Sequence, residues 1–389
     1  MNTLFTYFNE RRPLFRIYLG FALLFVVASF FIPYVNDYPQ YIMQWQRMLH
    51  GASPYETPSG NFKMFWYGPL HNAFVFPYAL HDNLPRVLFF SSWTIAAWIL
   101  VSNYFKILPN VKAWVIPVVV GFSFLNPYLF QLYYYGQNDL FVGALLFLAL
   151  SFHHKKSYMI AALCFVLAFT YKLYPIVLMP YFFYDNQLGS KLSRKQFFAS
   201  INWKFVGWFV VFTVATMGIQ YAVYGEYGLR SYFTVLDRKP TSSSVFYFLT
   251  EVAHVALNPN VSIVTALFGL FATMFLYVFN KIDRYAGIIL AILIVFMSSK
   301  VFYFSYELCF LLILPFYKCI CLKEGKHFKI IPFFVIIAVV FTAVLLFRYG
   351  FDYRLKDYKG ALYLIPNGYL FFYVLTFSIR RSHASVTAY

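Results

Sequence analysis

The sequence predicts an all-α integral membrane protein with about twelve transmembrane helices, and interfacial helices in its first outer loop. Two observations support this fold class directly. The 389-residue chain is 61% hydrophobic and only 12% charged, with a mean hydropathy of +0.63, which is too apolar for an ordinary soluble domain. Apolar runs of about 17 to 25 residues, long enough to cross a hydrocarbon core, recur from Leu14 onward. No polar stretch between them is long enough to form a separate soluble domain, so we expect one polytopic domain over residues 1–389.

The distribution of charge is the third observation. With the basic N-terminus in the cytoplasm, most of the 31 Lys and Arg residues but few of the 14 acidic ones fall in inside loops. This positive-inside bias accounts for the net charge of +17, so we expect no nucleic-acid partner and place both termini in the cytoplasm. The inside basic residues are Arg11, Arg12, Arg16, Lys106, Lys112, Lys155, Lys156, Lys191, Arg194, Lys195, Lys204, Lys281, Arg284, Lys318, Lys323, Lys326, Lys329, Arg380 and Arg381.

The first span, expected at about 14–33, leads into the longest polar stretch, an outer loop over 35–85. In this loop Tyr38, Tyr41 and Trp45 share one helical face, which is typical of a helix lying in the interface. A second interfacial or re-entrant helix is expected at 69–80, and further outer loops at 225–258 and 348–363. The remaining spans are expected at 86–105, 113–131, 138–153, 157–173, 174–186, 205–224, 260–280, 284–299, 302–320, 330–347 and 364–379.

Several common sites of soluble enzymes have no counterpart in the sequence. It contains no phosphate-binding Walker loop, no dinucleotide fingerprint, no H-E-x-x-H and no Cys/His spacing for a metal. No second acid stands beside Asp37 to hold a divalent cation. We therefore expect neither a metal nor a cofactor. The four cysteines fall in spans or on the basic side, where we expect packing rather than disulfides.

The candidate functional residues are polar groups near the outer ends of spans, where ionisable side chains are costly to hold. Asp37 follows the first span at once, although an aspartate there is also a good helix N-cap. Gln137 and Asn138 can hold sugar hydroxyls or merely begin a helix. Lys172 lies in the middle of 157–186, either in an outside turn or buried facing a polar cavity.

Basic residues on the same side offer anion binding. Lys300 can neutralise a phosphate or extend to lipid headgroups, as lysines at span ends commonly do. Arg230 and Arg238 in the second outer loop present the same two alternatives.

Four motifs in this order resemble the GT-C superfamily of membrane glycosyltransferases, and most closely glycosyltransferase family 87, the polyprenyl-phosphate-mannose-dependent mannosyltransferases. The catalytic subunit of GPI mannosyltransferase I is a more distant resemblance. The motifs, which run from Asp37 to about Pro315, are Asp37 with Gly51-Ala52-Ser53-Pro54-Tyr55 and Phe65-Trp66-Tyr67-Gly68-Pro69-Leu70; Asn126-Pro127 with Gly136-Gln137-Asn138; Lys172-Leu173-Tyr174-Pro175; and Lys300 with Tyr306.

The resemblance implies a GT-C fold and transfer of a hexose, which we expect to be mannose, with inversion. The donor would be a polyprenyl-phosphate-linked sugar, the acceptor a glycolipid or glycan, and the site the outer face of a bacterial inner (plasma) membrane, in a pathway building cell-envelope glycan. Asp37 would be the general base. The donor phosphate would be bound by Lys300 and Lys172, with Arg230 and Arg238 in reserve. The sugar and acceptor would be bound by Glu56, Tyr67, His71, Gln137, Asn138 and Tyr306.

Three other functions share the same membrane spans. A transporter or lipid-linked sugar flippase predicts two matching halves with Gly/Pro-interrupted spans, and the sequence shows no such halves. An outer-face polysaccharide polymerase would depend on arginines in two large loops rather than on an acid directly after the first span. A non-catalytic scaffold gives no reason for polar groups from distant segments to gather on one face.

Overall fold

The computed structural model describes residues 139–184, 198–225, 240–302 apart from 242 and 259, residue 306, 308–349 and 358–384, with isolated residues at 20–51 and Leu229. These described parts are helical and contain no named strand; Tyr184 and Ile201 form an isolated antiparallel bridge. The expected spans at 14–33, 86–105 and 113–131 and the interfacial helices lie outside the described residues, apart from those isolated positions.

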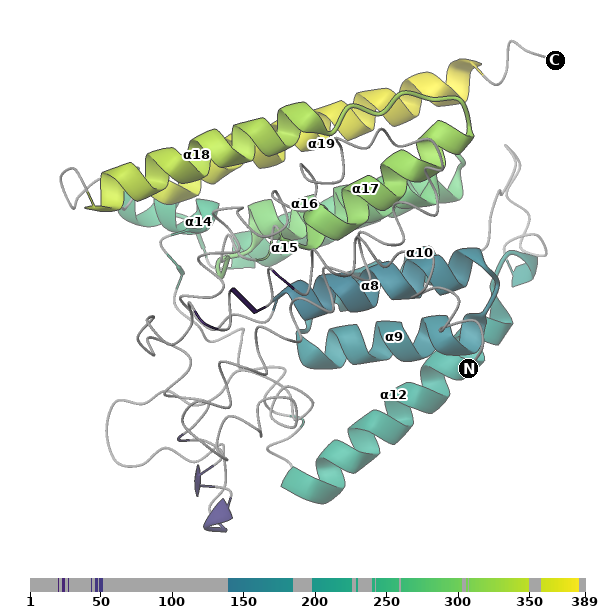
Figure 1. The fold of residues 1–389 in the computed structure, drawn as a ribbon. Helices are drawn as coiled ribbons and strands as arrows, with labels where there is room; N and C mark the ends of the chain where they lie inside the picture. Colours follow the sequence, from purple (N-terminus) through teal and green to yellow (C-terminus); the bar gives the residue numbers. More distant parts are fainter. Residues whose placement is uncertain are drawn as a thin grey trace.

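The first group of helices begins with a hairpin of α8 (Asp139–His154) and α9 (Tyr158–Tyr171) (Figure 1). The chain then turns through a 3-10 helix, η2 (Tyr174–Leu178), into the short α10 (Met179–Phe183). The long α12 (Trp203–Tyr224) packs on α9, and the Asn202 side chain caps its first turn by accepting from Phe205 N. The expected spans at 138–153, 157–173 and 205–224 therefore coincide with helices, and η2 and α10 occupy most of 174–186.

The second group begins with a short helical segment, α14 (Val245–Tyr247) followed by the π-turn η4 (Phe248–Val252), inside the expected outer loop 225–258. Four longer helices follow: α15 (Asn260–Val278), α16 (Arg284–Ser298), α17 (Leu308–Lys323) and α18 (Ile331–Tyr349). The chain closes with α19 (Lys359–Ala384), which tolerates Pro366 in its interior. Helix α19 packs against both α16 and α18.

Two helix boundaries differ from the expected spans. Helix α17 is Leu308–Lys323, whereas the span was expected from 302; the main-chain N–H and C=O of Phe302 bond to the Thr241 hydroxyl rather than within a helix. Helix α19 begins at Lys359 rather than 364, and its first turn packs against α14. Gly360 permits this approach, since a Cβ there would collide with the Ser244 carbonyl. Tertiary contacts, which apolar run length does not report, set both boundaries.

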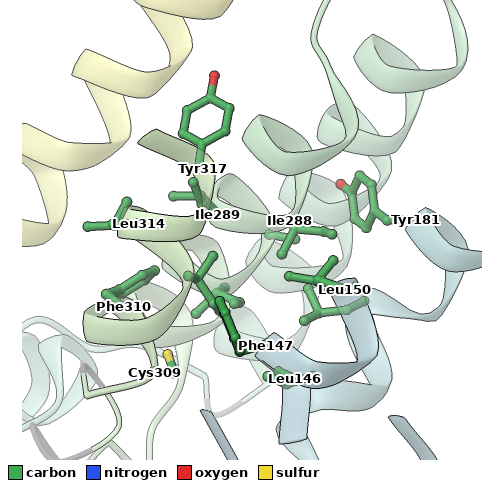
Figure 2. Close-up of a cluster of buried hydrophobic side chains, with 14 of the residues drawn as sticks. Leu146, Phe147, Leu150, Tyr181, Ile288, Ile289, Cys309, Phe310, Leu314 and Tyr317 are labelled. Atoms are coloured by element: carbon green, nitrogen blue, oxygen red, sulfur yellow. The ribbon is translucent and has the colours of Figure 1, made fainter. Parts of the chain in front are cut away.

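The hydrophobic core lies around α16. Its positions from Ala286 to Leu293 are all buried, as expected for a helix that is apolar on every face. Figure 2 shows how side chains of α8, such as Phe147, meet Ile288 and Ile289 of α16 and Phe310 of α17. Cys309 and Cys321 are buried in the same core and Cys164 in α9, which agrees with a packing role.

Long apolar helices with exposed apolar faces identify the class of protein. In the described residues three helices are long and apolar enough to cross a membrane, over Trp203–Val223, Asn260–Val278 and Gly360–Ile379. Helix α15 exposes large apolar side chains, including Phe268 at 76% and Phe271 at 72%. A protein surrounded by water rarely exposes such contiguous apolar surface. These helices indicate a helical membrane protein.

Candidate functional site

The helices place the three described candidate residues and most of the described basic residues at opposite ends. At one end, here named the Arg284 end, the Arg284 guanidinium bonds to residues of three other helical elements. Its Nη1 donates to His153 Nδ1 at 2.8 Å, its Nη2 to the Tyr184 carbonyl at 2.6 Å and its Nε to Tyr277 Oη at 3.2 Å. The ends of α8, α10 and α15 therefore meet the start of α16.

The turns between helices at the Arg284 end are basic. Lys155 and Lys156 lie between α8 and α9, Lys281 lies between α15 and α16, and Lys326 pairs with Glu324 after α17. These are residues that the charge pattern assigned to inside loops. The opposite end, here named the Lys172 end, contains Lys172, Lys300 and Tyr306, which the sequence analysis expects on the outer side. It lies where α9 and α16 end and α17 begins.

Lys172 is a buried lysine at the end of α9. It is the C-cap residue, with an extended backbone, and its N–H closes the helix by donating to the Ala168 carbonyl at 3.1 Å. The side chain is only 7% exposed. Its ammonium lies 4.9 Å from the centroid of the Tyr306 ring, in cation–π geometry. Lys172 thus lies in the bend after α9 and is buried, with its ammonium against an aromatic ring.

Other aromatic rings surround Tyr306, the residue whose ring contacts the Lys172 ammonium. Tyr306 stacks on Tyr174, with ring centroids 5.6 Å apart and 27° between planes. Its ring also packs edge to face on Phe302, with centroids 6.0 Å apart, and against Phe296, with centroids 5.9 Å apart. Two of the proposed motifs, Lys172-Leu173-Tyr174-Pro175 and Lys300 with Tyr306, are therefore in direct contact although they are far apart in the sequence.

Lys300 lies in the connection between α16 and α17, residues 299–307, which also contains Tyr306. Of this connection the structure describes 299–302 and 306. The Lys300 carbonyl accepts from Thr241 N at 3.0 Å, and its side chain is partly exposed. Thr241 Oγ1 donates to the Phe302 carbonyl at 2.7 Å and accepts from Phe302 N at 3.0 Å. Thr241 therefore bonds to the main chain of two described residues of this connection, Lys300 and Phe302.

The remaining candidates lie outside the described residues, so the structure does not report their positions. They are Asp37, Glu56, Tyr67, His71, Gln137, Asn138, Arg230 and Arg238. Helix α8 begins at Asp139, directly after Gln137 and Asn138 in the sequence, and Thr241 follows Arg238 by three positions.

Sequence reasoning did not select Thr241, Phe296 or Phe302. A threonine in an outer loop carries no signal of its own, and a phenylalanine in an apolar run reads as core. The hydrogen bond between His153 and Arg284 was not predicted either, because the two residues lie 131 positions apart in the sequence, on α8 and α16. The aromatic run from Val301 to Tyr306 was the one available sign that Lys300 has aromatic neighbours.

The arrangement suits an anionic group next to an apolar or sugar moiety. A buried ammonium favours an anion strongly, since it has few waters to compete. Tyrosine and phenylalanine rings pack against apolar chains and against the C–H faces of sugars. The described part of the Lys172 end thus offers a buried cation, a second lysine on the adjoining connection and an aromatic wall.

Fold and site together define a helical membrane protein with a buried cation among aromatic side chains at one end of its helices. The sequence profile of glycosyltransferase family 87 matches residues 65–308, which is more than half of the chain, and the chain belongs to this family. It is also 24% identical over 196 residues to GPI mannosyltransferase 1 of Dictyostelium discoideum. That alignment covers 48% of this chain and 43% of the relative, so less than half of the relative's length is matched.

Proposed function

We propose that this glycosyltransferase moves mannose, with inversion, from a polyprenyl-phosphate-linked donor to a glycolipid or glycan acceptor at the outer face of the membrane. Family membership supports sugar transfer, and the mannosyltransferase relative supports mannose. The observation that carries the choice of donor is the burial of the Lys172 ammonium against Tyr306 at one end of apolar helices. A phosphate bearing a long hydrocarbon chain fits a cation placed beside lipid-exposed helices.

The outer face is supported by the separation of charges. The basic turns gather at the Arg284 end, and basic loops favour the cytoplasmic side of a membrane. The Lys172 end is then extracytoplasmic, where lipid-linked sugars rather than nucleotide sugars serve as donors. A bacterial inner membrane with both termini inside is consistent with this orientation.

In the proposed reaction an acceptor hydroxyl oxygen attacks the anomeric carbon while the bond from that carbon to the phosphate oxygen breaks. Asp37 takes the hydroxyl proton, and polyprenyl phosphate leaves as an anion. Lys172 and Lys300 stabilise the charge that develops on the leaving phosphate, with Arg230 and Arg238 as further cations. Glu56, Tyr67, His71, Gln137, Asn138 and Tyr306 orient the sugar and the acceptor. No step in this scheme needs a metal.

The test is a comparison of donors with the purified full chain in detergent or proteoliposomes. Radiolabelled mannose is supplied as polyprenyl-phosphate mannose or as a nucleotide-linked sugar, with a glycolipid extract as acceptor and EDTA present in a parallel series. We expect labelled product only from the polyprenyl-phosphate donor, with or without EDTA. Transfer from the nucleotide sugar, or movement of the donor across the bilayer without any product, would refute the proposal.

A further inference from the structure

Thr241 joins two parts of the chain that are distant in sequence. Its side-chain oxygen makes two hydrogen bonds with the main chain of Phe302, and its own N–H donates to the Lys300 carbonyl at 3.0 Å. These three bonds link the expected outer loop 225–258 to the connection between α16 and α17. No side chain of that connection takes part, so the bonds fix the path of the backbone.

The hydroxyl replaces the partners that Phe302 would have in a helix. The Phe302 side chain is 2% exposed, and buried main-chain N–H and C=O groups need hydrogen-bond partners. Because one hydroxyl serves both groups, it holds Phe302 in a non-helical path between Ser299 and α17. The positions of Lys300 and Tyr306 on either side depend on that path.

Thr241 is itself anchored on the other side. Its carbonyl accepts from Ser244 N at 2.8 Å and from Ser244 Oγ at 2.9 Å. Ser244 Oγ in turn caps α14 by accepting from Tyr247 N at 3.0 Å, and the Ser244 carbonyl lies against Gly360 of α19. Thr241 is therefore anchored to α14, which packs on α19, and its bonds to Lys300 and Phe302 fix the connection relative to these two helices.

We propose that Thr241 is a positioning residue for donor binding: it holds the Lys300–Tyr306 connection so that both side chains face the donor phosphate next to Lys172. This inference rests on the proposed function. Thr241 touches no reacting atom in the proposed scheme and acts through Lys300 and Tyr306. Lys300 is a proposed ligand of the donor phosphate, and the Tyr306 ring holds Lys172, the other proposed phosphate ligand. Loosening the connection therefore weakens recognition of the donor and leaves recognition of the acceptor intact.

The experiment measures steady-state kinetics of the full chain with polyprenyl-phosphate mannose and a glycolipid acceptor. Thr241→Val removes the hydroxyl at nearly constant volume, and Thr241→Ser retains it. Thr250→Val is the matched control, because Thr250 lies in the same expected outer loop 225–258 and, among the described residues, its hydroxyl bonds to carbonyls of its own turn, Phe246 and Tyr247. Thr241→Ala is made as well, and the folded fraction of each variant is measured by size exclusion and thermal unfolding.

For Thr241→Val and Thr241→Ala we expect the donor KM to rise about tenfold, the equivalent of one or two hydrogen bonds, with an unchanged acceptor KM. Thr241→Ser should restore the donor KM, and Thr250→Val should match the wild type. The inference is overturned if the donor KM and the acceptor KM change equally, or if Thr241→Val and Thr250→Val have the same donor KM. It is also overturned if both Thr241→Val and Thr241→Ala lose folded protein. An inactive wild type would instead count against the proposed function, so the two failures are distinguishable.

Discussion

The Lys172 ammonium lies over the ring of Tyr306, 4.9 Å from its centroid, and the lysine is almost fully buried. This contact joins the end of α9 to the connection that precedes α17. A cation held in this way is preorganised for an incoming anion, because the cost of taking its charge out of water is met during folding rather than during binding.

Removing the Lys172 charge tests its role towards the donor. We expect Lys172→Met to lower kcat/KM for a polyprenyl-phosphate donor by about 10²- to 10³-fold, the usual effect of losing one stabilising donor of a leaving group's charge. Lys172→Arg should recover part of the activity, since it keeps the charge but not the shape. The measurement is steady-state transfer of labelled mannose.

Lys155 provides the matched control for Lys172. Its ammonium also lies over an aromatic ring, Phe152, at 5.9 Å, but the residue is exposed and sits at the Arg284 end. Lys155→Met should leave the donor kinetics unchanged. If Lys172→Met and Lys155→Met behave alike, Lys172 is not a phosphate ligand.

The ring of Tyr306, rather than its hydroxyl, is expected to hold Lys172. Tyr306→Leu removes the cation–π contact and the stacking on Tyr174. We therefore expect the transition state to lose about 1 to 2 kcal/mol of stabilisation, which lowers kcat/KM roughly 5- to 30-fold. Tyr306→Phe keeps the ring and should stay close to wild type. A Phe variant as impaired as the Leu variant would show that the hydroxyl, for instance through a sugar contact, carries the function.

Most helices from 139 onward coincide with apolar runs that charged or turn residues bound, and three of these described helices are long and apolar enough to cross a membrane. The boundaries failed where tertiary contacts decide them. Residues Val301 to Phe310 are rich in apolar and aromatic residues and look like the start of a span, yet the main-chain groups of Phe302 bond to the Thr241 hydroxyl and α17 is Leu308–Lys323. Similarly, close packing on α14 allows α19 to begin before 364.

The roles of the candidate site residues stay predictions, and the structure describes how three of these residues lie. Resemblance motifs selected Lys172, Lys300 and Tyr306, and the structure brings Lys172 and Tyr306 into contact. Neither residue type nor spacing could give that pairing, since the two residues belong to different helical hairpins. Thr241 gave no sequence signal, because a hydroxyl acquires a role only through the backbone groups that it meets.

Gly287 in the central helix has a specific steric role. A Cβ at this position would overlap the ring of Tyr181, which is buried and donates to Thr273 Oγ1 at 2.8 Å. We expect Gly287→Ala to destabilise the protein by about 1 to 3 kcal/mol through overpacking, visible as a lower thermal unfolding midpoint in detergent. Gly218→Ala in α12 is the control, since a Cβ there meets nothing within 4 Å. Equal midpoints for the two variants would contradict the close approach of α16 and α10.

Arg284 is expected to stabilise the fold without taking part in transfer. It bonds to groups of three other elements at the end opposite Lys172. We expect Arg284→Met to lower the free energy of unfolding by about 1.5 to 3 kcal/mol, the range for a hydrogen bond to a charged group, and to lower the thermal unfolding midpoint. Lys281→Met, an exposed lysine in the same turn, should have little effect. Activity per folded Arg284→Met molecule should equal that of the wild type; a selective loss of kcat would show coupling between the two ends.

The general base is the last element of the scheme that a substitution can test. Asp37→Asn keeps the size of the side chain and its ability to cap a helix but cannot accept the acceptor proton, so we expect transfer to fall by about 10²- to 10⁴-fold with normal expression and unfolding temperature. Glu251→Gln is the control, because Glu251 is an exposed acid in η4, beside α14 at the Lys172 end. The two substitutions separate general-base catalysis from a general effect of negative charge on that side. Undiminished transfer by Asp37→Asn would leave Asp37 as a helix cap and require another base for the reaction.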